Sequence, residues 1–117
     1  MVNNTRTTKI VVVEDESDIA ALVAYQLAHA GYQVRTATNG REALKAIELD
    51  PPDLVVLDID FGPQQVTGLD VLEAVRLNDE LLTTPILLVT AVQRETEQVI
   101  RGLELGAADY VTRPRDN

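Results

Sequence analysis

The chain has 117 residues, enough for one domain around a single hydrophobic core but too few for a second. It has no cysteine, which excludes disulfides and thiolate metal sites, and its net charge of −9 opposes direct binding to a nucleic-acid backbone. No uncharged apolar stretch approaches the about 20 residues that cross a bilayer, and the first residues lack a signal peptide's apolar region, so we expect a cytoplasmic protein that contacts neither nucleic acid nor membrane.

The first predicted elements are a buried strand and a helix. The β-branched apolar run at residues 9–13 is too short for a helix and is ended by the acidic group 14–16, so it predicts a strand. Ser17 or Asp18 can cap the helix that follows, and Gly31 supplies its stop signal. Residues 32–37 then alternate with the period of a second strand.

The rest of the chain repeats this alternation. Asn39-Gly40 opens a second helix, which Pro51-Pro52 ends. Further strands are predicted at 54–57, 85–90 and 109–112, and further helices at 69–77 and about 94–105. Regular alternation of short apolar strands with helices predicts an α/β domain, in which helices cover both faces of a five-stranded parallel sheet in a three-layer, doubly wound arrangement.

Polar side chains stand where the predicted strands end. In a parallel sheet the carboxyl ends of the strands form the working crevice, so groups distant in sequence meet there. Carboxylates brought together in this way repel one another, and a divalent cation bound by their oxygens would offset this repulsion. Mg²⁺ suits such a small set of oxygen ligands. The candidate residues are Glu14, Asp15, Asp58, Asp60, Thr90 and Arg113.

Four segments together resemble the receiver domains of two-component response regulators. They are Lys9-Ile-Val-Val-Val-Glu-Asp-Glu16, Asp53-Leu-Val-Val-Leu-Asp58, Leu88-Val-Thr-Ala91 and Gly106-Ala-Ala-Asp-Tyr-Val-Thr-Arg-Pro114. Each segment alone is a weak signal, but their order and spacing are specific. The resemblance runs from Lys9 to Arg115, so we expect a polar tail at 1–8 and a receiver domain at 9–117 with a flavodoxin-like fold.

The resemblance also implies a role for each candidate residue. Asp58 corresponds to the phosphoacceptor, Asp15 to a direct Mg²⁺ ligand, Glu14 to a ligand through metal-bound water, and Asp60 to a ligand through its backbone carbonyl. Asp58 also belongs to this metal set. Thr90 corresponds to the hydroxyl that hydrogen-bonds the phosphoryl group, Tyr110 to an aromatic switch residue that moves inward on activation, and Arg113 to the cation beside the phosphoryl group.

The implied function is that of a phosphorelay switch rather than an enzyme. Asp58 would accept a phosphoryl group from a sensor histidine kinase or a phosphotransfer protein, and the resulting change would control an output domain or downstream protein. The alternative is a pseudo-receiver that only binds proteins. Arg113 leaves both open because the family has lysine at this position, and a planar guanidinium could either clamp the phosphoryl group or occupy the resting site.

Two further departures concern the chain around the site. The loop at 61–68 is longer than is usual in the family, and the family's fifth helix has no counterpart in these 117 residues, so we expect a C-terminally truncated receiver domain. Without that helix one face of the sheet is only partly covered, which predicts self-association into a homodimer. Candidates for that uncovered side include Val11, Val13, Val55, Leu57 and Val111, although the sequence alone leaves open which alternate residues of each strand face it.

Overall fold

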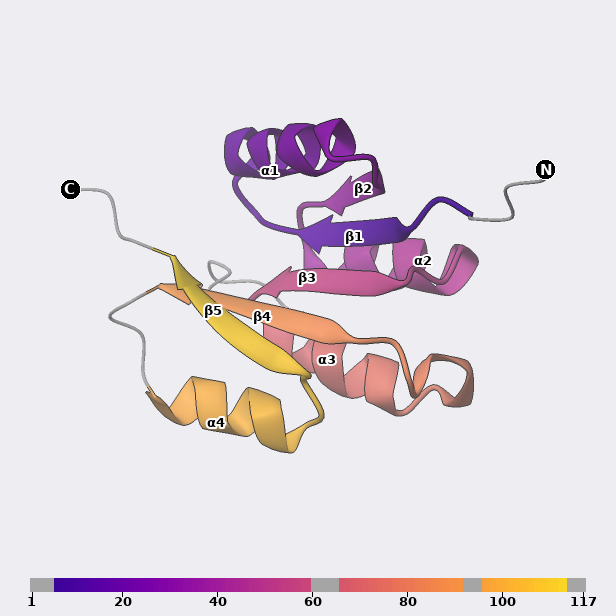
Figure 1. Ribbon diagram of the computed structural model, residues 1–117. Coiled ribbons are helices and arrows are strands. Elements are labelled where there is room, and N and C mark those ends of the chain that lie inside the picture. Colours follow the sequence, from indigo (N-terminus) through magenta and orange to yellow (C-terminus); the bar gives the residue numbers. More distant parts are fainter. Residues whose placement is uncertain (1–5, 60–65, 92–95, 114–117) are drawn as a thin grey trace.

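The computed structural model describes residues 6–59, 66–91 and 96–113 (Figure 1). Strands and helices alternate along the chain as predicted. The strands are β1 (Lys9–Val13), β2 (Gln33–Ala37), β3 (Leu54–Asp58), β4 (Ile86–Ala91) and β5 (Asp109–Arg113). The helices are α1 (Ser17–His29), α2 (Gly40–Leu49), α3 (Gly68–Arg76), the 3₁₀ turn η1 (Asp79–Leu81) and α4 (Thr96–Glu104).

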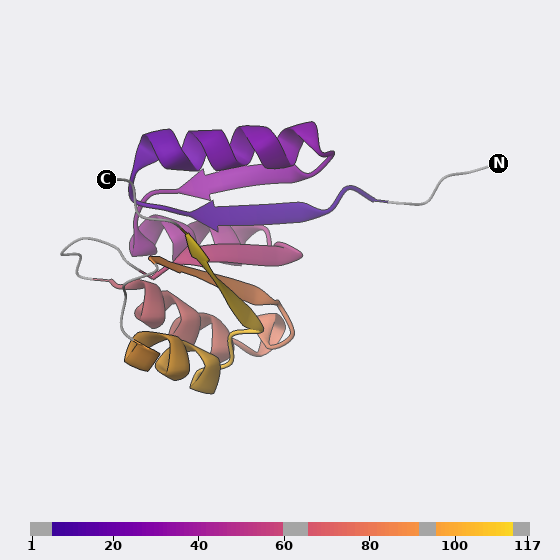
Figure 2. The same cartoon turned by 60° about the vertical axis from the view of Figure 1, so that its left-hand side comes forward.

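The five strands form one parallel sheet in the order β2-β1-β3-β4-β5. α1 lies over β1 and β2 on one face, whereas α2, α3 and α4 lie on the other (Figure 1 and Figure 2). The predicted three-layer, doubly wound fold is therefore confirmed. No helix of the described residues combines the length and the apolar character needed to cross a membrane.

The core fills the space between the sheet and the α2–α3 layer. Because strand side chains alternate between faces, every second residue of β1, β3 and β4 points into this core. Its fully buried members include Val11, Val13, Val55, Leu57, Ile47, Val71, Leu72, Val75, Ile86 and Leu88. The expectation that Val11, Val13, Val55 and Leu57 lie on the uncovered side is wrong, because the sheet turns these four toward α2 and α3.

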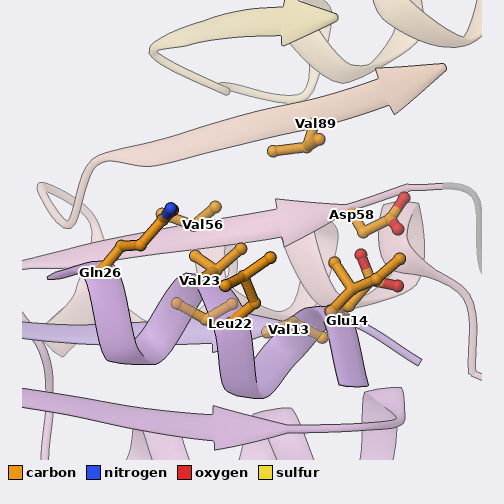
Figure 3. Close-up of a pocket in the computed structure, with 10 residues that line it drawn as sticks. Val13, Glu14, Leu22, Val23, Gln26, Val56, Asp58 and Val89 are labelled. Carbon is orange, nitrogen blue, oxygen red and sulfur yellow. The ribbon is translucent and has the colours of Figure 1, made fainter. Parts of the chain in front are cut away.

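The uncovered side carries the alternate residues of the same strands. Val12, Val56 and Val89 line an open groove of about 460 Å³ between the sheet and α1, into which Leu22 also points (Figure 3). Val111 pairs in register with Val89 and is 45% exposed, so the expectation for this one residue is confirmed. Among the described residues, α1 alone covers this face, and only in part.

Local signals explain most of the element ends. Asn39 caps α2 by accepting a hydrogen bond from the backbone N–H of Glu42, and Gly31 follows α1 with a φ of +105° that favours glycine. The predicted cap of α1 is wrong, since Glu16 holds the capping position and makes no side-chain capping bond. η1 was not predicted; the Asn78 side chain accepts from the Glu80 N–H at its start.

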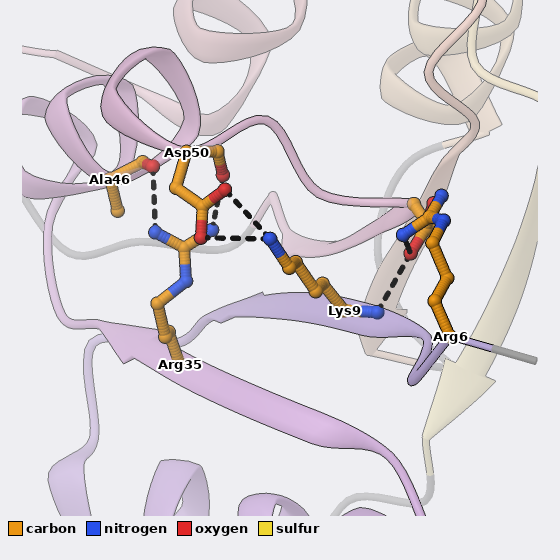
Figure 4. A network of polar contacts seen from close by, with 6 residues as sticks. Arg6, Lys9, Arg35, Ala46 and Asp50 are labelled. Carbon is orange, nitrogen blue, oxygen red and sulfur yellow. Dashed lines mark hydrogen bonds and ion pairs between the residues drawn. The ribbon is translucent and has the colours of Figure 1, made fainter.

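Charged groups tie the amino-terminal ends of β1 and β3 together, at the far end of the sheet from the predicted site (Figure 4). Arg6 pairs with Asp53, which also accepts from the Lys9 backbone N–H at 2.8 Å, and the Lys9 ammonium lies 3.0 Å from Asp50. Hydrogen bonds from Arg6 and the Lys9 backbone hold the pKa of Asp53 below its usual value, and Lys9 does the same for Asp50.

Candidate functional site at the carboxyl end of the sheet

Three buried polar residues stand at the carboxyl ends of adjacent strands. Asp58 ends β3 and is 2% exposed, Glu14 directly follows β1 at 5%, and Thr90 lies near the end of β4 at 1%. The backbone N–H of Glu14 donates to the Ala37 carbonyl, so the pairing of β1 with β2 continues to this residue and fixes it. Burying carboxylates costs free energy, so a position like this one requires compensating contacts.

Glu14 and Asp58 share one wall of the groove described above. Both line it, and the close-up shows their side chains at the same end of the groove, where β1 and β3 end (Figure 3). β1 and β3 are neighbours, and their register pairs Val13 with Leu57, which places the two acids one residue further on at the same level. The predicted convergence of these two residues is thus present in the fold.

Three carboxylates lie close enough together to offer oxygen ligands to a cation. One oxygen each of Glu14, Asp15 and Glu16 lies within 4.8 Å of the others, and Glu14 also accepts from the Glu16 backbone N–H at 3.1 Å. This hard, oxygen-only set fits Mg²⁺ better than metals that prefer nitrogen or sulfur. Glu16 was not predicted as a ligand, although it belongs to the acidic run that signalled the site. Asp58 is not part of this triplet.

The backbone of Asp58 packs against the start of α3. A Cβ on Gly68 would lie 2.9 Å from the Asp58 carbonyl oxygen and 2.9 Å from the Ile59 Cα, so only glycine permits this approach. A capping box fixes the helix start: the Asp70 N–H donates to the Thr67 hydroxyl at 3.1 Å, and the Thr67 N–H donates to the Asp70 carboxylate at 3.0 Å. Neither the approach of Gly68 to the Asp58 backbone nor the capping box was predicted from the sequence.

Some of the remaining predicted site residues lie in the part of the chain that the structure describes, and others lie outside it. Thr90 pairs in register with Thr112 and Leu88 with Tyr110, so both Thr90 and Tyr110 lie on the α4 side of the sheet. Tyr110 is 41% exposed. Asp60, the loop at 61–65 and the side chain of Arg113 lie outside the described residues, so their predicted roles stay predictions.

The chain matches the family described as response regulator receiver domain over residues 10–117. It belongs to this family. A curated relative, the alkaline phosphatase synthesis transcriptional regulatory protein PhoP of Bacillus subtilis, is 45% identical over 106 residues, which are 91% of this chain and 42% of PhoP. The receiver domain therefore spans less than half the length of that relative.

Solved receiver structures have the same fold. The chemotaxis protein CheY4 of Vibrio cholerae superimposes with a TM-score of 0.83 at 30% identity, covering 95% of this chain and 90% of that one. NtrX of Brucella abortus superimposes with a TM-score of 0.84 at 31% identity, covering 95% of this chain and 24% of that one. The chain is thus a two-component phosphoacceptor domain of flavodoxin-like fold, as the sequence predicts.

Proposed function

We propose that Asp58 is the residue of this receiver domain that accepts the phosphoryl group. The observation that supports this best is its position: a carboxylate 2% exposed at the end of the central strand β3, in one groove with Glu14. A carboxylate kept in such a place despite the desolvation cost is typical of a nucleophile or a ligand.

The transfer needs few chemical steps from the protein. A carboxylate oxygen of Asp58 forms the bond to phosphorus while the bond from phosphorus to the donor nitrogen or oxygen breaks, and the donor keeps that electron pair. Thr90, on the adjacent strand β4, would donate its hydroxyl hydrogen to a phosphoryl oxygen. Water later hydrolyses the acyl phosphate and restores Asp58. The domain thus processes its own modification and does not act as an enzyme on a separate substrate.

Glu14, Asp15 and Asp58, with the Asp60 carbonyl, would hold the Mg²⁺ ion. When bound, the ion offsets negative charge on the phosphoryl oxygens. Glu14 and Asp15 are proposed as ligands because one carboxylate oxygen of each lies within 4.8 Å of the other. Glu16 would strengthen the local negative potential that attracts the cation, whether or not it contacts the ion.

Arg113 and Tyr110 complete the proposed switch. β5 ends at Arg113, beside the Ala91 end of β4, which puts its backbone at the same edge of the sheet as Thr90. From there the guanidinium would contact the phosphoryl oxygens in the role that lysine has in the family. Tyr110 would change its exposure with the phosphorylation state.

The partners follow from the family and from the surface. The donor would be the phosphohistidine of a sensor kinase or of a phosphotransfer protein in the cytoplasm, and the target an output domain or a downstream protein; the PhoP relative is named as a transcriptional regulator. A second copy of this chain is a further proposed partner, because the groove between the sheet and α1 is open and apolar, and Leu22, 58% exposed, lines it.

Intact-mass measurement after incubation with acetyl phosphate and Mg²⁺ tests the proposal. We expect the mass of one added phosphoryl group, no addition in Asp58→Asn, and normal addition in Asp53→Asn, whose carboxylate lies at the opposite end of the same sheet. Labelling of Asp58→Asn to the same extent would refute the assignment. An unlabelled but folded wild-type protein would instead indicate the pseudo-receiver alternative.

Thermal unfolding tests the metal separately from the chemistry. Mg²⁺ at about ten times its dissociation constant should stabilise the fold by about 1.4 kcal/mol through mass action. Asp15→Asn should abolish most of this increase, whereas Asp18→Asn, in the first turn of α1, should keep it. An equal response of both variants to Mg²⁺ would contradict the ligand set.

A further inference from the structure

Val66, two residues before α3, is seated on the start of α2. It is half-buried and packs against the hydrophobic core. A Cβ on Gly40, the first residue of α2, would lie 2.5 Å from the Val66 Cγ1 and 2.7 Å from the Val66 carbonyl oxygen. Only glycine at position 40 leaves room for both atoms, so the side chain and the backbone of Val66 both lie directly against α2.

The start of α2 is itself held firmly on both sides. The Asn39 side chain caps the helix by accepting a hydrogen bond from the Glu42 backbone N–H at 2.8 Å. Ala37 ends β2 three residues before Gly40, and its carbonyl accepts from the Glu14 backbone N–H at 3.0 Å. The backbone around Gly40 is therefore tied both into α2 and to the strand end that carries Glu14, which makes it a rigid support.

The residues after Val66 lead directly to the acceptor. Only Thr67 separates Val66 from Gly68, and the capping box that Thr67 forms with Asp70 fixes its conformation. Gly68 in turn packs on the Asp58 backbone, because a Cβ there would lie 2.9 Å from the Asp58 carbonyl oxygen. The segment 66–68 is thus a three-residue bridge between the start of α2 and the end of β3.

We propose that Val66 is a positioning residue of the phosphoacceptor site. Seated on Gly40, it fixes the place at which Gly68 meets the backbone of the acceptor. The inference rests on the proposed phosphorylation of Asp58. Val66 acts through Gly68 and not by contact with the reacting atoms. The attacking carboxylate oxygen must meet phosphorus at about 3–3.5 Å and in line, so a small displacement of the Asp58 backbone lowers the rate of transfer.

The rate at which acetyl phosphate labels the protein tests the proposal, measured by intact mass at saturating Mg²⁺ and donor and well below Tm. Val66→Ala removes Cγ1, the Val66 atom that Gly40 approaches most closely. Because a misplacement of about 1 Å costs about a hundredfold in rate, we expect this smaller disturbance to slow labelling about tenfold. Val66→Thr keeps a branched side chain of similar shape and should label close to the wild-type rate, although its half-buried hydroxyl lowers Tm. A wild-type rate in Val66→Ala would overturn the proposal.

Val75→Ala is the matched control for stability. It makes the same chemical change in the last turn of α3, where the side chain is fully buried and lies about 10 Å along the helix from Gly68. Because truncating a fully buried valine leaves a larger cavity than truncating a half-buried one, this variant should lose more stability than Val66→Ala. It should nevertheless label at the wild-type rate. Equal slowing in the two variants would show that stability alone sets the rate, and would refute a positioning role.

Gly40→Ala disturbs the same contact from the side of α2. Its Cβ would displace Val66, so labelling should slow in this variant too. In the double variant with Val66→Ala the nearest clash, with Cγ1, is gone, and the loss of rate should be smaller than the product of the two single losses. Losses that simply multiply would show that the contact between the two residues does not carry the effect. An unlabelled wild type would count against Asp58 as the acceptor, not against Val66.

Discussion

Gly68→Ala is expected to damage both the stability and the chemistry of the domain. The new Cβ would lie 2.9 Å from the Asp58 carbonyl oxygen and 2.9 Å from the Ile59 Cα, well inside normal contact distance. Both are backbone atoms, and the Ile59 N–H is held by a 3.1 Å hydrogen bond to the Val89 carbonyl. The strain cannot be relieved by rotating a side chain, so the end of β3 or the start of α3 must move.

The size of the effect follows from two opposing terms. Overpacking a tight contact costs about 1–3 kcal/mol, whereas alanine gains up to about 1 kcal/mol over glycine from its helix propensity. Because Gly68 is the first residue of α3, it realises only part of that gain. We expect a net loss of about 1–2 kcal/mol in the free energy of unfolding, which lowers Tm by roughly 4–10 °C.

The assay pairs thermal unfolding with the rate of labelling by acetyl phosphate. Gly31→Ala is the matched control, because its φ of +105° strains an alanine by about 1–2 kcal/mol while no atom lies within 4 Å of the new Cβ. Both variants should lose similar stability, but only Gly68→Ala should label more slowly. Wild-type stability of Gly68→Ala, or equal slowing of labelling in both variants, would refute the reasoning.

Three other predictions concern the cation, the acidic network and the groove. Arg113→Lys should label at least as fast as the wild type with acetyl phosphate, and a large loss of labelling would show that the guanidinium itself is required. The pKa values of Asp50 and Asp53 lie below 3.8. Their contribution to stability is therefore full above that pH and is lost as the pH falls through their pKa values in the folded state. Urea unfolding at pH 6 and pH 3 should show that Asp53→Asn loses less stability on acidification than the wild type does. Light scattering over a concentration series should show dimers that Leu22→Glu weakens and Leu49→Glu, at a still more exposed position at the end of α2, does not. A monomer at high concentration would defeat this prediction.

The sequence predicted the order and kind of the main elements because their signals are local. β-branched runs predicted the strands, and Asn39 and Gly31 marked helix ends by their own chemistry. Where two local signals compete, the prediction failed: Ser17 and Asp18 both suit a cap, yet α1 begins one residue earlier after Glu16. Such errors of a residue or two are usual at helix ends.

The signal by which the sequence predicted the site residues was their position at the ends of strands. Glu14, Asp58 and Thr90 are brought together by parallel pairing, which requires knowing only that three strands are neighbours. Gly68 was assigned to the loop before the predicted helix at 69–77, and its contact with the Asp58 backbone was not predicted. That contact depends on the angle at which α3 leaves the loop, and no local pattern encodes this angle.

Packing that no local pattern encodes also explains why Val11, Val13, Val55 and Leu57, named as candidates for the uncovered face, lie on the other face. A strand of four valines or isoleucines, such as β1, is apolar on both sides, so its composition carries no period that tells one face from the other. The face is decided by which helices pack where, and a shift of one residue exchanges the whole set. Arg76 is a related case, because an arginine in the last turn of a helix reads as a favourable partner of the helix dipole. Only the fold brings Gly106 within reach of it, so that Arg76 ties the end of α3 to the turn before β5.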